Sequence, residues 1–301
     1  MPDYLLGIDI GATNTRIAVV DTHGNIITSS HLPSHMAAGR SFFENVGQRA
    51  KELANKHDVR AIGVGSAGQL DRKTGTYLPG LYPDAAWTGV PLQEIIQQAT
   101  NRPTVVDNDC KISAYAELKV GRGQGLEDFV SLTIGTGIGG GVIANGEIVH
   151  GEKGVAGHVG HISVEPGGLL CACGNRGCLE LYASGTAVAK RATTLLQEEV
   201  TSPEVFKRAS LGDKVCLGVI DEMAIALGRG LGAMANMLNP EVFILGGSIL
   251  EWYPLLEKTL VHSFTQNVMK GLKNTPILRS ELEGRGGVIG AALYAWDKMG
   301  R

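Results

Sequence analysis

The sequence predicts an α/β protein of two domains. Segments typical of strands alternate with segments typical of helices along 301 residues, a length for which about two domains are expected. A strand, a turn rich in Gly and Thr, and a second strand occur twice, at residues 5–20 and 130–149. We expect short crossings near 110–125 and 286–290. The predicted domains are a smaller one of residues 1–118 plus 290–301 and a larger one of residues 119–289.

The first half opens with three predicted antiparallel strands. Apolar residues alternate with turn residues, which indicates strands at 4–10, 16–20 and 26–28 joined by two tight turns. Helical spacing of apolar residues follows over 41–57. The remaining expected elements are a buried strand at 59–65, a loop rich in Gly and Pro over roughly 66–90, a helix at 92–100, a strand at 103–106 and a helix at 111–120.

The second half repeats the opening pattern and then becomes mostly helical. A strand at 128–134 runs into a glycine-rich turn at 135–141. A second strand at 142–144, an Asn145–Gly146 hairpin turn and a strand at 147–149 follow. The other expected elements are helices from 184 onward, above all at 213–238, a strand at 242–245, and a C-terminal helix opened by a glycine-rich turn at 286.

Composition and charge exclude several classes of protein. The net charge is −3 and no block of Lys and Arg occurs, so we expect no nucleic-acid partner and no anionic membrane surface as partner. No apolar run approaches the roughly 18 residues of a membrane span, and the first residues lack the features of a secretory signal. Five cysteines, an odd number, fit a reducing compartment better than a disulfide framework. We therefore expect a cytoplasmic protein.

Three of the five cysteines lie within eight residues. Cys171, Cys173 and Cys178, with His161 ten residues upstream of the first, supply three thiolates and one imidazole. This is the ligand set of a closed tetrahedral zinc site, which leaves no open position for a reacting water. The sequence therefore predicts a structural zinc, and the alternative is a zinc knuckle with no link to a substrate.

The two glycine-rich turns are candidate phosphate sites. Gly135, Gly137 and Gly140 match the spacing of the dinucleotide fingerprint, but a strand follows them where that fingerprint requires a helix. A turn between antiparallel strands can still present backbone N–H groups and Thr hydroxyls to an anion. Asp9 stands beside the first turn and could hold a phosphate-bound cation directly or through water. The pair of turns predicts phosphate binding, with two ordinary hairpins as the alternative.

Residues 106–110 read Val-Asp-Asn-Asp-Cys and place carboxylates at the end of a predicted strand. A kinase acting on a hydroxyl needs such a carboxylate, because an alcohol is a poor nucleophile until its proton has somewhere to go. From spacing alone, the stronger interpretation is that Asn108 or Asp109 caps the helix that starts near Lys111.

Together these motifs resemble those of the ROK family (repressor, open reading frame, kinase) of sugar kinases. Residues 9–15 and 133–141 resemble its two phosphate motifs, 171–180 its zinc signature and 239–248 its adenosine-side strand. The match stays in register from residue 5 to about 292. The resemblance implies a two-domain actin-like ATPase fold, ribonuclease H-like and hexokinase-like, with a cleft between the domains.

The resemblance also implies an activity and the residues that perform it. The expected reaction is ATP-dependent phosphorylation of the 6-hydroxyl of a hexose or N-acetylhexosamine, with Asp109 as general base, a catalytic Mg²⁺, a structural Zn²⁺ and a homodimer. The implied sugar contacts are Gly68, Asn108, Asp109, His158, His161 and Glu180. The implied nucleotide contacts are Asp9, Gly11, Thr13, Asn14, Thr133, Gly135, Thr136, Gly137, Gly246 and Gly247.

Two departures from the family pattern leave the sugar open. Lys111 stands where the family often has Asn or a small residue. His158 stands where most family glucokinases have Glu and where bacterial N-acetylmannosamine kinases have His, whereas residues 87–92 look like the glucokinase version of their loop. Glucose and N-acetylmannosamine are therefore both expected substrates, and a role for His158 in supporting the zinc loop is the alternative.

Two other functions within the same family compete with a kinase. A sugar-responsive regulator would carry a DNA-binding segment in front, for which a phosphate motif that follows so closely on residue 5 leaves no room. An inactive sugar-binding protein would not need Asp9, Asp109 and both turns. We therefore expect an enzyme.

Overall fold

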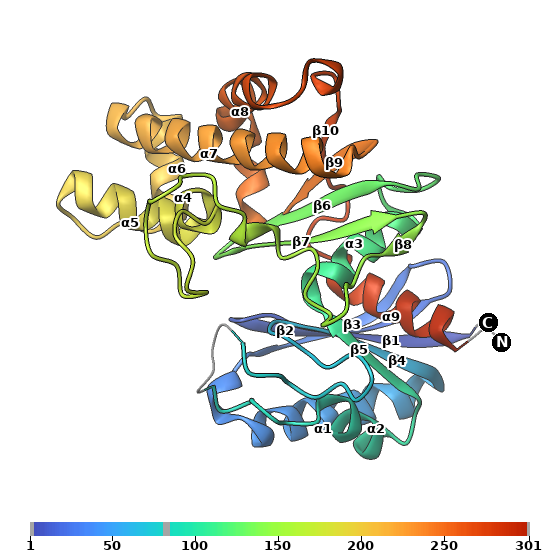
Figure 1. Cartoon of the computed structure of the whole chain (residues 1–301). Helices are drawn as coiled ribbons and strands as arrows, with labels where there is room; N and C mark the ends of the chain where they lie inside the picture. The colour runs from blue at the N-terminus through green and yellow to red at the C-terminus, as the bar shows by residue number, and fades with distance from the viewer. Residues whose placement is uncertain (1–2, 81–84, 300–301) are drawn as a thin grey trace. The chain divides into compact units, whose positions relative to one another are not determined.

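The computed structural model describes residues 3–80 and 85–299, and they divide into two units. Unit 1 comprises Met1–Glu127, Gly141–Gly157 and Glu281–Arg301, and unit 2 comprises Asp128–Gly140 and His158–Ser280. Each unit has helices packed on a sheet (Figure 1). Among the described residues, no helix is both long and apolar enough to cross a membrane.

Unit 1 contains a five-stranded sheet in the order β3-β2-β1-β4-β5. The first three strands, β1 (Tyr4–Ile10), β2 (Asn14–Asp21) and β3 (Ile26–Pro33), are antiparallel neighbours, which confirms the predicted opening. The strands β4 (Val59–Ser66) and β5 (Thr104–Asn108) add in parallel, so their carboxyl ends meet at one edge with that of β1. Asp9, near the end of β1, and Asp109, directly after β5, lie at this edge.

Helices cover both faces of this sheet. One apolar cluster joins α1 (Arg40–His57) and α2 (Leu92–Thr100) to one face, and a second joins α3 (Asp109–Val120) and α9 (Gly286–Lys298) to the other. A 3-10 turn at Met36–Ala38 precedes α1. The predicted helices at 41–57, 92–100 and 111–120 are confirmed within two residues at their starts.

Glycines let α9 lie unusually close to the sheet. A Cβ added at Gly7 of β1 would lie 1.8 Å from the carbonyl oxygen of Val288, and one at Gly63 of β4 would lie 1.7 Å from that of Ala291. No side chain fits such gaps, so only glycine permits the helix to rest on both strands. The glycines at the start of α9 lie inside the helix rather than in the predicted turn before it.

The second sheet has the order β10-β9-β6-β7-β8. The strands β6 (Phe129–Ile134) and β10 (Ile277–Arg279) flank β9 (Val242–Gly246) in parallel, whereas β7 (Ile138–Ala144) and β8 (Glu147–Ile148) form an antiparallel hairpin. The end of β7 and all of β8 belong to unit 1.

The second glycine-rich turn is shorter than the sequence suggested. β7 begins at Ile138, so Gly139, Gly140 and Gly141 are strand residues rather than turn residues. A Cβ at Gly141 would lie 2.5 Å from that of Ala114 in α3. This glycine therefore permits close packing, and the turn itself is confined to residues 135–137.

Unit 2 is otherwise helical, as predicted. Its longest helix is confirmed at α7 (Lys214–Leu238), where Asp213 caps the first turn and Asn239 ends the helix in the left-handed conformation. The other helices are α4 (Glu180–Ala183), α5 (Gly185–Leu196), α6 (Ser202–Ser210) and α8 (Tyr253–Asn267), with 3-10 turns at Val159–His161, Ser248–Trp252 and Lys270–Leu272. The three-residue β10 was not predicted, because so short a strand has no measurable periodicity.

Candidate functional site

Asp109 lies where β5 ends and α3 begins, at the carboxyl edge of the unit 1 sheet. Its Oδ1 accepts hydrogen bonds from the backbone N–H of Cys110 at 2.9 Å and from the Asn108 side chain at 3.0 Å. Burial raises the pKa of Asp109, although the bonds to Cys110 and the charge of Lys111 partly oppose the shift. A carboxylate that is fixed in place and more basic than usual can accept a proton from an alcohol.

Asn108 caps α3, as the spacing predicted. Its Oδ1 accepts from the backbone N–H groups of Cys110 and Lys111, and its Nδ2 donates to the carbonyl oxygen of Gly68 at 3.3 Å. Gly68 has a φ of +102°, and a Cβ there would meet the ring of Tyr77 at 3.4 Å. Asn108 therefore forms the cap of α3, and Oδ1 of Asp109 accepts a further hydrogen bond from the first turn of the same helix.

Asp9 lies at the same sheet edge, near the end of β1. Burial and the negative charge of Asp109 raise the pKa of Asp9 to about 7, while Arg16 opposes the shift. A Cβ at Gly287 in the first turn of α9 would lie 2.3 Å from the Asp9 carboxylate, so the glycine leaves room for that group. Two interacting carboxylates at one edge favour binding of a cation.

The first turn directly follows β1, the strand that carries Asp9, and its residues 12–14 are exposed. Gly11 N–H donates to the carbonyl oxygen of Asn14 at 3.1 Å, and the carbonyl oxygen of Thr13 accepts from Ser34 N–H at 2.9 Å. Thr13 and Asn14 are both exposed. One backbone bond within the turn and one from Ser34 therefore hold it, and Thr13 lies on its exposed side.

The second turn, in unit 2, is held by Glu180. Gly135 N–H donates to the carbonyl oxygen of Gly137 at 3.0 Å, and Glu180 Oε2 accepts from the N–H of Ile138 at 2.8 Å. A Cβ at Gly137 would lie 2.5 Å from that carboxylate. The sequence did not reveal this link, because nothing in the spacing of the two segments indicates that they meet.

A cavity of about 890 Å³ opens on the second turn. Gly135 and Thr136 line one side of it, and α5, the loop at 199–201, α6 and the 3-10 turn Ser248–Trp252 supply the rest. This volume is typical of sites for small molecules. Gly246 and Gly247 do not line it, but Gly247 has a φ of +98° and directs the chain into Ser248, which does.

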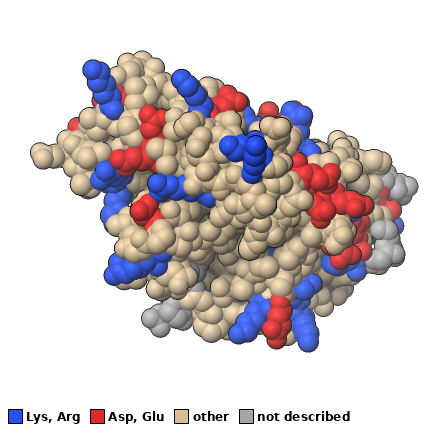
Figure 2. Space-filling model, turned by 45° about the horizontal axis from the view of Figure 1, so that its top comes forward, with Lys and Arg blue, Asp and Glu red and all other residues tan. Residues whose placement is uncertain are grey.

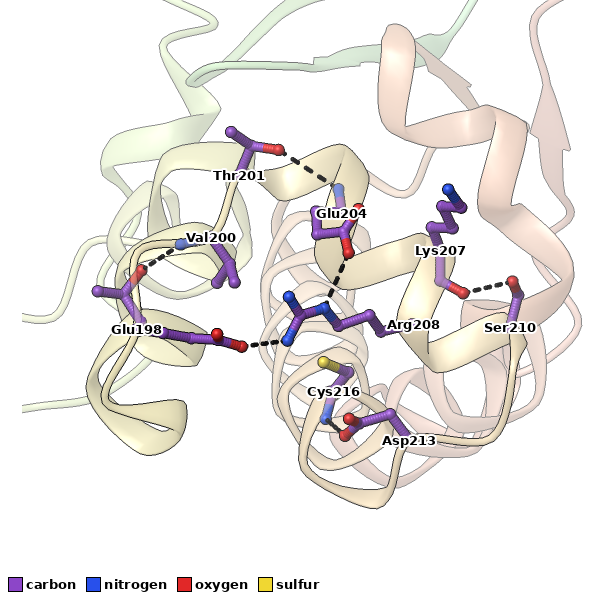
Figure 3. A network of polar contacts seen from close by, with 10 residues as sticks. Glu198, Val200, Thr201, Glu204, Lys207, Arg208, Ser210, Asp213 and Cys216 are labelled. Carbon is purple, nitrogen blue, oxygen red and sulfur yellow. Dashed lines mark hydrogen bonds and ion pairs between the residues drawn. The ribbon is translucent and has the colours of Figure 1, made fainter.

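One ion pair and one hydrogen bond hold the loop between α5 and α6, which forms one wall of this cavity. Arg208 in α6 bonds to Glu198 in the loop before the helix and, at 2.9 Å, to Glu204 (Figure 3). In the same loop Val200 N–H donates to the Thr193 hydroxyl at 3.2 Å. Sequence analysis missed this wall, since its residues carry no recognisable motif.

The four predicted metal ligands come together. The ligand atoms of His161, Cys171, Cys173 and Cys178 all lie within 4.8 Å of one another. The Sγ atoms of Cys173 and Cys178 are 3.5 Å apart, too far for a disulfide bond, and Cys171 Sγ is 3.7 Å from His161 Nδ1. A tetrahedral zinc with bonds of about 2.3 Å would separate its ligands by about 3.8 Å, so these residues fit that metal.

His158 and Glu180 flank the metal cluster in the chain. The rings of His158 and His161 lie 6.4 Å apart, at the two ends of a 3-10 turn. Glu180 follows Cys178 by two residues and begins α4. A metal bound to His161 and Cys178 would therefore fix the backbone of both candidate sugar contacts.

The face of the molecule drawn in Figure 2 carries charges of both signs. On the face drawn in Figure 2, acidic and basic side chains are both present and no continuous basic surface is seen. This agrees with the net charge of −3.

Comparison with known proteins identifies the family. The family model described as ROK family matches residues 5–298. The chain belongs to the ROK family. The resemblance predicted from the sequence is thereby confirmed.

The similar curated proteins include two kinds of kinase. The chain is 33% identical to a glucokinase from Halalkalibacterium halodurans, with 95% of this chain and 93% of that protein covered. It is also 33% identical to an N-acetylmannosamine kinase from Yersinia pestis, with 96% and 97% covered.

Solved structures confirm the two-domain actin-like kinase fold. A ROK family glucokinase from Streptomyces griseus, in complex with glucose and AMPPNP, superposes with a TM-score of 0.86 at 32% identity, covering 98% of this chain and 99% of that one. A ROK family transcriptional regulator has a TM-score of 0.87 at 24% identity, and the match covers 98% of this chain and 78% of that one, a likeness of fold alone.

Proposed function

We propose that this protein is an ATP-dependent sugar kinase that phosphorylates the 6-hydroxyl of a hexose or N-acetylhexosamine. The observation that carries the proposal is the placement of Asp109 at the carboxyl end of β5, with a raised pKa and with one oxygen fixed by the N–H of Cys110. The kinases to which the chain is 33% identical over almost its full length support the same activity.

Asp109 acts as the general base in this proposal. Its carboxylate accepts the proton of the 6-hydroxyl while the hydroxyl oxygen bonds to the terminal phosphorus of ATP, and the bond from that phosphorus to the bridging oxygen of ADP breaks. Phosphoryl transfer needs positioning and charge stabilisation more than covalent help from the protein. The fixed orientation of Asp109 supplies part of that positioning.

The nucleotide would be bound by the two turns and the cavity. The cavity would take the nucleoside, because it opens on Gly135 and Thr136 of the second turn. Backbone N–H groups of the two turns, with the Thr13 and Thr136 hydroxyls, would bind phosphate oxygens. Asp9 would hold the phosphate-bound Mg²⁺, which neutralises charge on the phosphates.

The zinc ligands would stabilise the sugar contacts. His161, Cys171, Cys173 and Cys178 would hold a zinc that takes no part in the reaction. The zinc would keep His158 and Glu180 at fixed positions in a glycine-rich segment. A neutral imidazole at His158 would offer one donor and one acceptor, where a carboxylate would offer acceptors alone.

A panel of sugars tests the proposal. Purified protein with MgATP is incubated with glucose, mannose, N-acetylglucosamine and N-acetylmannosamine, and ADP release and the sugar phosphate are measured. We expect turnover with at least one sugar, with glucose and N-acetylmannosamine giving the highest kcat/KM. Absence of product with all four sugars would reject the proposed kinase activity.

The alternatives are a sugar-binding regulator and an inactive sugar-binding protein of the same family. The likeness of fold to a ROK regulator does not favour either one, because that match rests on 24% identity. Sugar binding without ADP release in the same panel would support the inactive protein.

A further inference from the structure

Two polar contacts, one buried and one partly buried, tie residues 150–154 to the residues on either side of Asp109. His150 Nε2 lies 2.6 Å from Asp107 Oδ2, and Lys111 Nζ donates to the carbonyl oxygen of Gly154 at 2.7 Å. Asp107 and Lys111 each lie two residues from Asp109, on opposite sides. All these residues belong to unit 1, and the proposed mechanism uses none of them.

The Asp107–His150 pair is shielded from solvent. The two residues are only 5% and 8% exposed. Burial alone would raise the pKa of Asp107, but the hydrogen bond and charge of His150 lower it below its ordinary value. The other oxygen of Asp107 accepts from the Asn108 N–H at 2.8 Å. One carboxylate thus joins His150 to the backbone that leads into Asp109.

Lys111 is almost completely buried, at 1% exposure. A lysine on a helix usually extends its ammonium group into water, and burying it is costly unless the group is hydrogen-bonded. Here the ammonium donates to a backbone carbonyl instead, and burial lowers its pKa. The residue that departs from the family pattern therefore makes a specific contact across unit 1.

Close packing of the β7 strand supports these two contacts. A Cβ at Gly141 would lie 3.2 Å from the Lys111 Cα and 3.3 Å from the Cys110 carbonyl oxygen. The chain from Gly141 to Gly154 thus contacts the end of β5 at His150 and the start of α3 at Gly141 and Gly154.

We infer that Lys111 and His150 are positioning residues that fix the segment before His158 relative to Asp109. Gly154 precedes His158 by four residues, so a shift at Gly154 is passed along the backbone to the candidate sugar contact. The inference rests on the proposed function. It assigns to Lys111 and His150 the position of the unit 1 backbone that leads into a sugar contact, and the sugar KM and the choice between sugars depend on that position.

Substitutions that keep volume test this inference. Lys111→Met retains the unbranched stem and removes the donor, and His150→Leu removes the partner of Asp107. His150→Gln retains an N–H donor near the Nε2 position. Steady-state kinetics with both substrates and hydrogen exchange of residues 147–157 are measured for each variant. The control is Lys119→Met on the same helix, where the lysine is 39% exposed and pairs with Asp297.

We expect Lys111→Met and His150→Leu to raise the sugar KM about tenfold while the ATP KM changes less than about threefold. Exchange over 151–157 should become faster, His150→Gln should recover at least half of the change, and Lys119→Met should match the parent protein. Equal changes in the two KM values, or unchanged exchange over 151–157, would overturn the inference. If the parent protein phosphorylates no sugar, the proposed function fails, while the exchange measurement still decides whether the two contacts fix the segment.

Discussion

The carboxylate of Glu180 accepts a hydrogen bond from the N–H of Ile138 at 2.8 Å. Glu180 follows the last ligand cysteine by two residues, and Ile138 follows the second glycine turn. The Glu180 side chain thus links the segment that carries the four candidate metal ligands to the candidate phosphate turn of unit 2. A residue expected from resemblance to contact the sugar also holds the turn expected to contact the nucleotide.

This double role predicts different effects for two substitutions of Glu180. Glu180→Gln keeps an oxygen that can accept from Ile138 but removes the charge, so the ATP KM should change less than about threefold while the sugar KM rises about tenfold or more. Glu180→Ala removes the acceptor as well, and both KM values should rise. Initial-rate kinetics measure both KM values. An unchanged sugar KM in Glu180→Gln would show that Glu180 does not contact the sugar.

Asp109→Asn should lower kcat by about 10²–10⁴ with little change in sugar affinity, because the amide cannot accept the proton. Calorimetry gives the affinity, and a coupled assay gives the rate. Asp58→Asn is the matched control, since Asp58 is exposed and its left-handed φ of 47° also suits asparagine. Full activity in the Asp109 variant would exclude it as the base.

The raised pKa of Asp9 predicts a dependence of stability on pH. Its pKa is about 7 in the folded protein and 3.8 ordinarily, so between these values the folded state binds more protons than the unfolded state. The contribution of Asp9 to stability is therefore present at about pH 4 and is lost as the pH rises through 7. Without magnesium, the Tm of Asp9→Asn minus that of the parent protein should increase from pH 5 to pH 8. A constant difference across this range would contradict the shift.

The metal cluster predicts about one zinc per chain by elemental analysis. Cys173→Ser should lose most of the metal and weaken sugar binding at least about tenfold, because the segment between His158 and Glu180 loses its anchor. Cys216→Ala changes a cysteine in α7 outside the cluster and should retain the metal. If the sugar affinity were unchanged after complete loss of zinc, the proposal that the zinc stabilises the sugar contacts would be wrong.

The wall of the cavity predicts a selective effect on the nucleotide. Arg208→Met breaks the bonds to Glu198 and Glu204, so the loop before α6 should loosen and the ATP KM should rise about threefold to tenfold while the sugar KM stays constant. Arg191→Met, which breaks an exposed pair with Glu222, is the control and should leave both KM values unchanged. If only the sugar KM rose, the loop before α6 would not be part of the nucleotide site.

Elements with a strong local signal could be predicted from the sequence. The alternation over residues 4–28 and the apolar stripe of α1 each follow from a short stretch of chain, and the structure confirms both. The glycines at 139–141 were wrongly taken as part of a turn, since glycine serves turning and close packing equally well. At Gly141 the reason is close packing, because Ala114 lies against it in space although it stands 27 residues earlier in the chain.

The sequence by itself determined the order of most elements and four candidate metal ligands, and its resemblance to the ROK family determined the family and Asp109 as the candidate base. Each of these depends on residues that are close in the chain or on a motif of fixed spacing. Only the tertiary structure decided that Glu180 holds Ile138, that Asp9 and Asp109 share one sheet edge, and that Lys111 is buried with its ammonium on Gly154. These contacts join residues 40 or more positions apart, and the packing of strands and helices, not local propensity, brings such residues together.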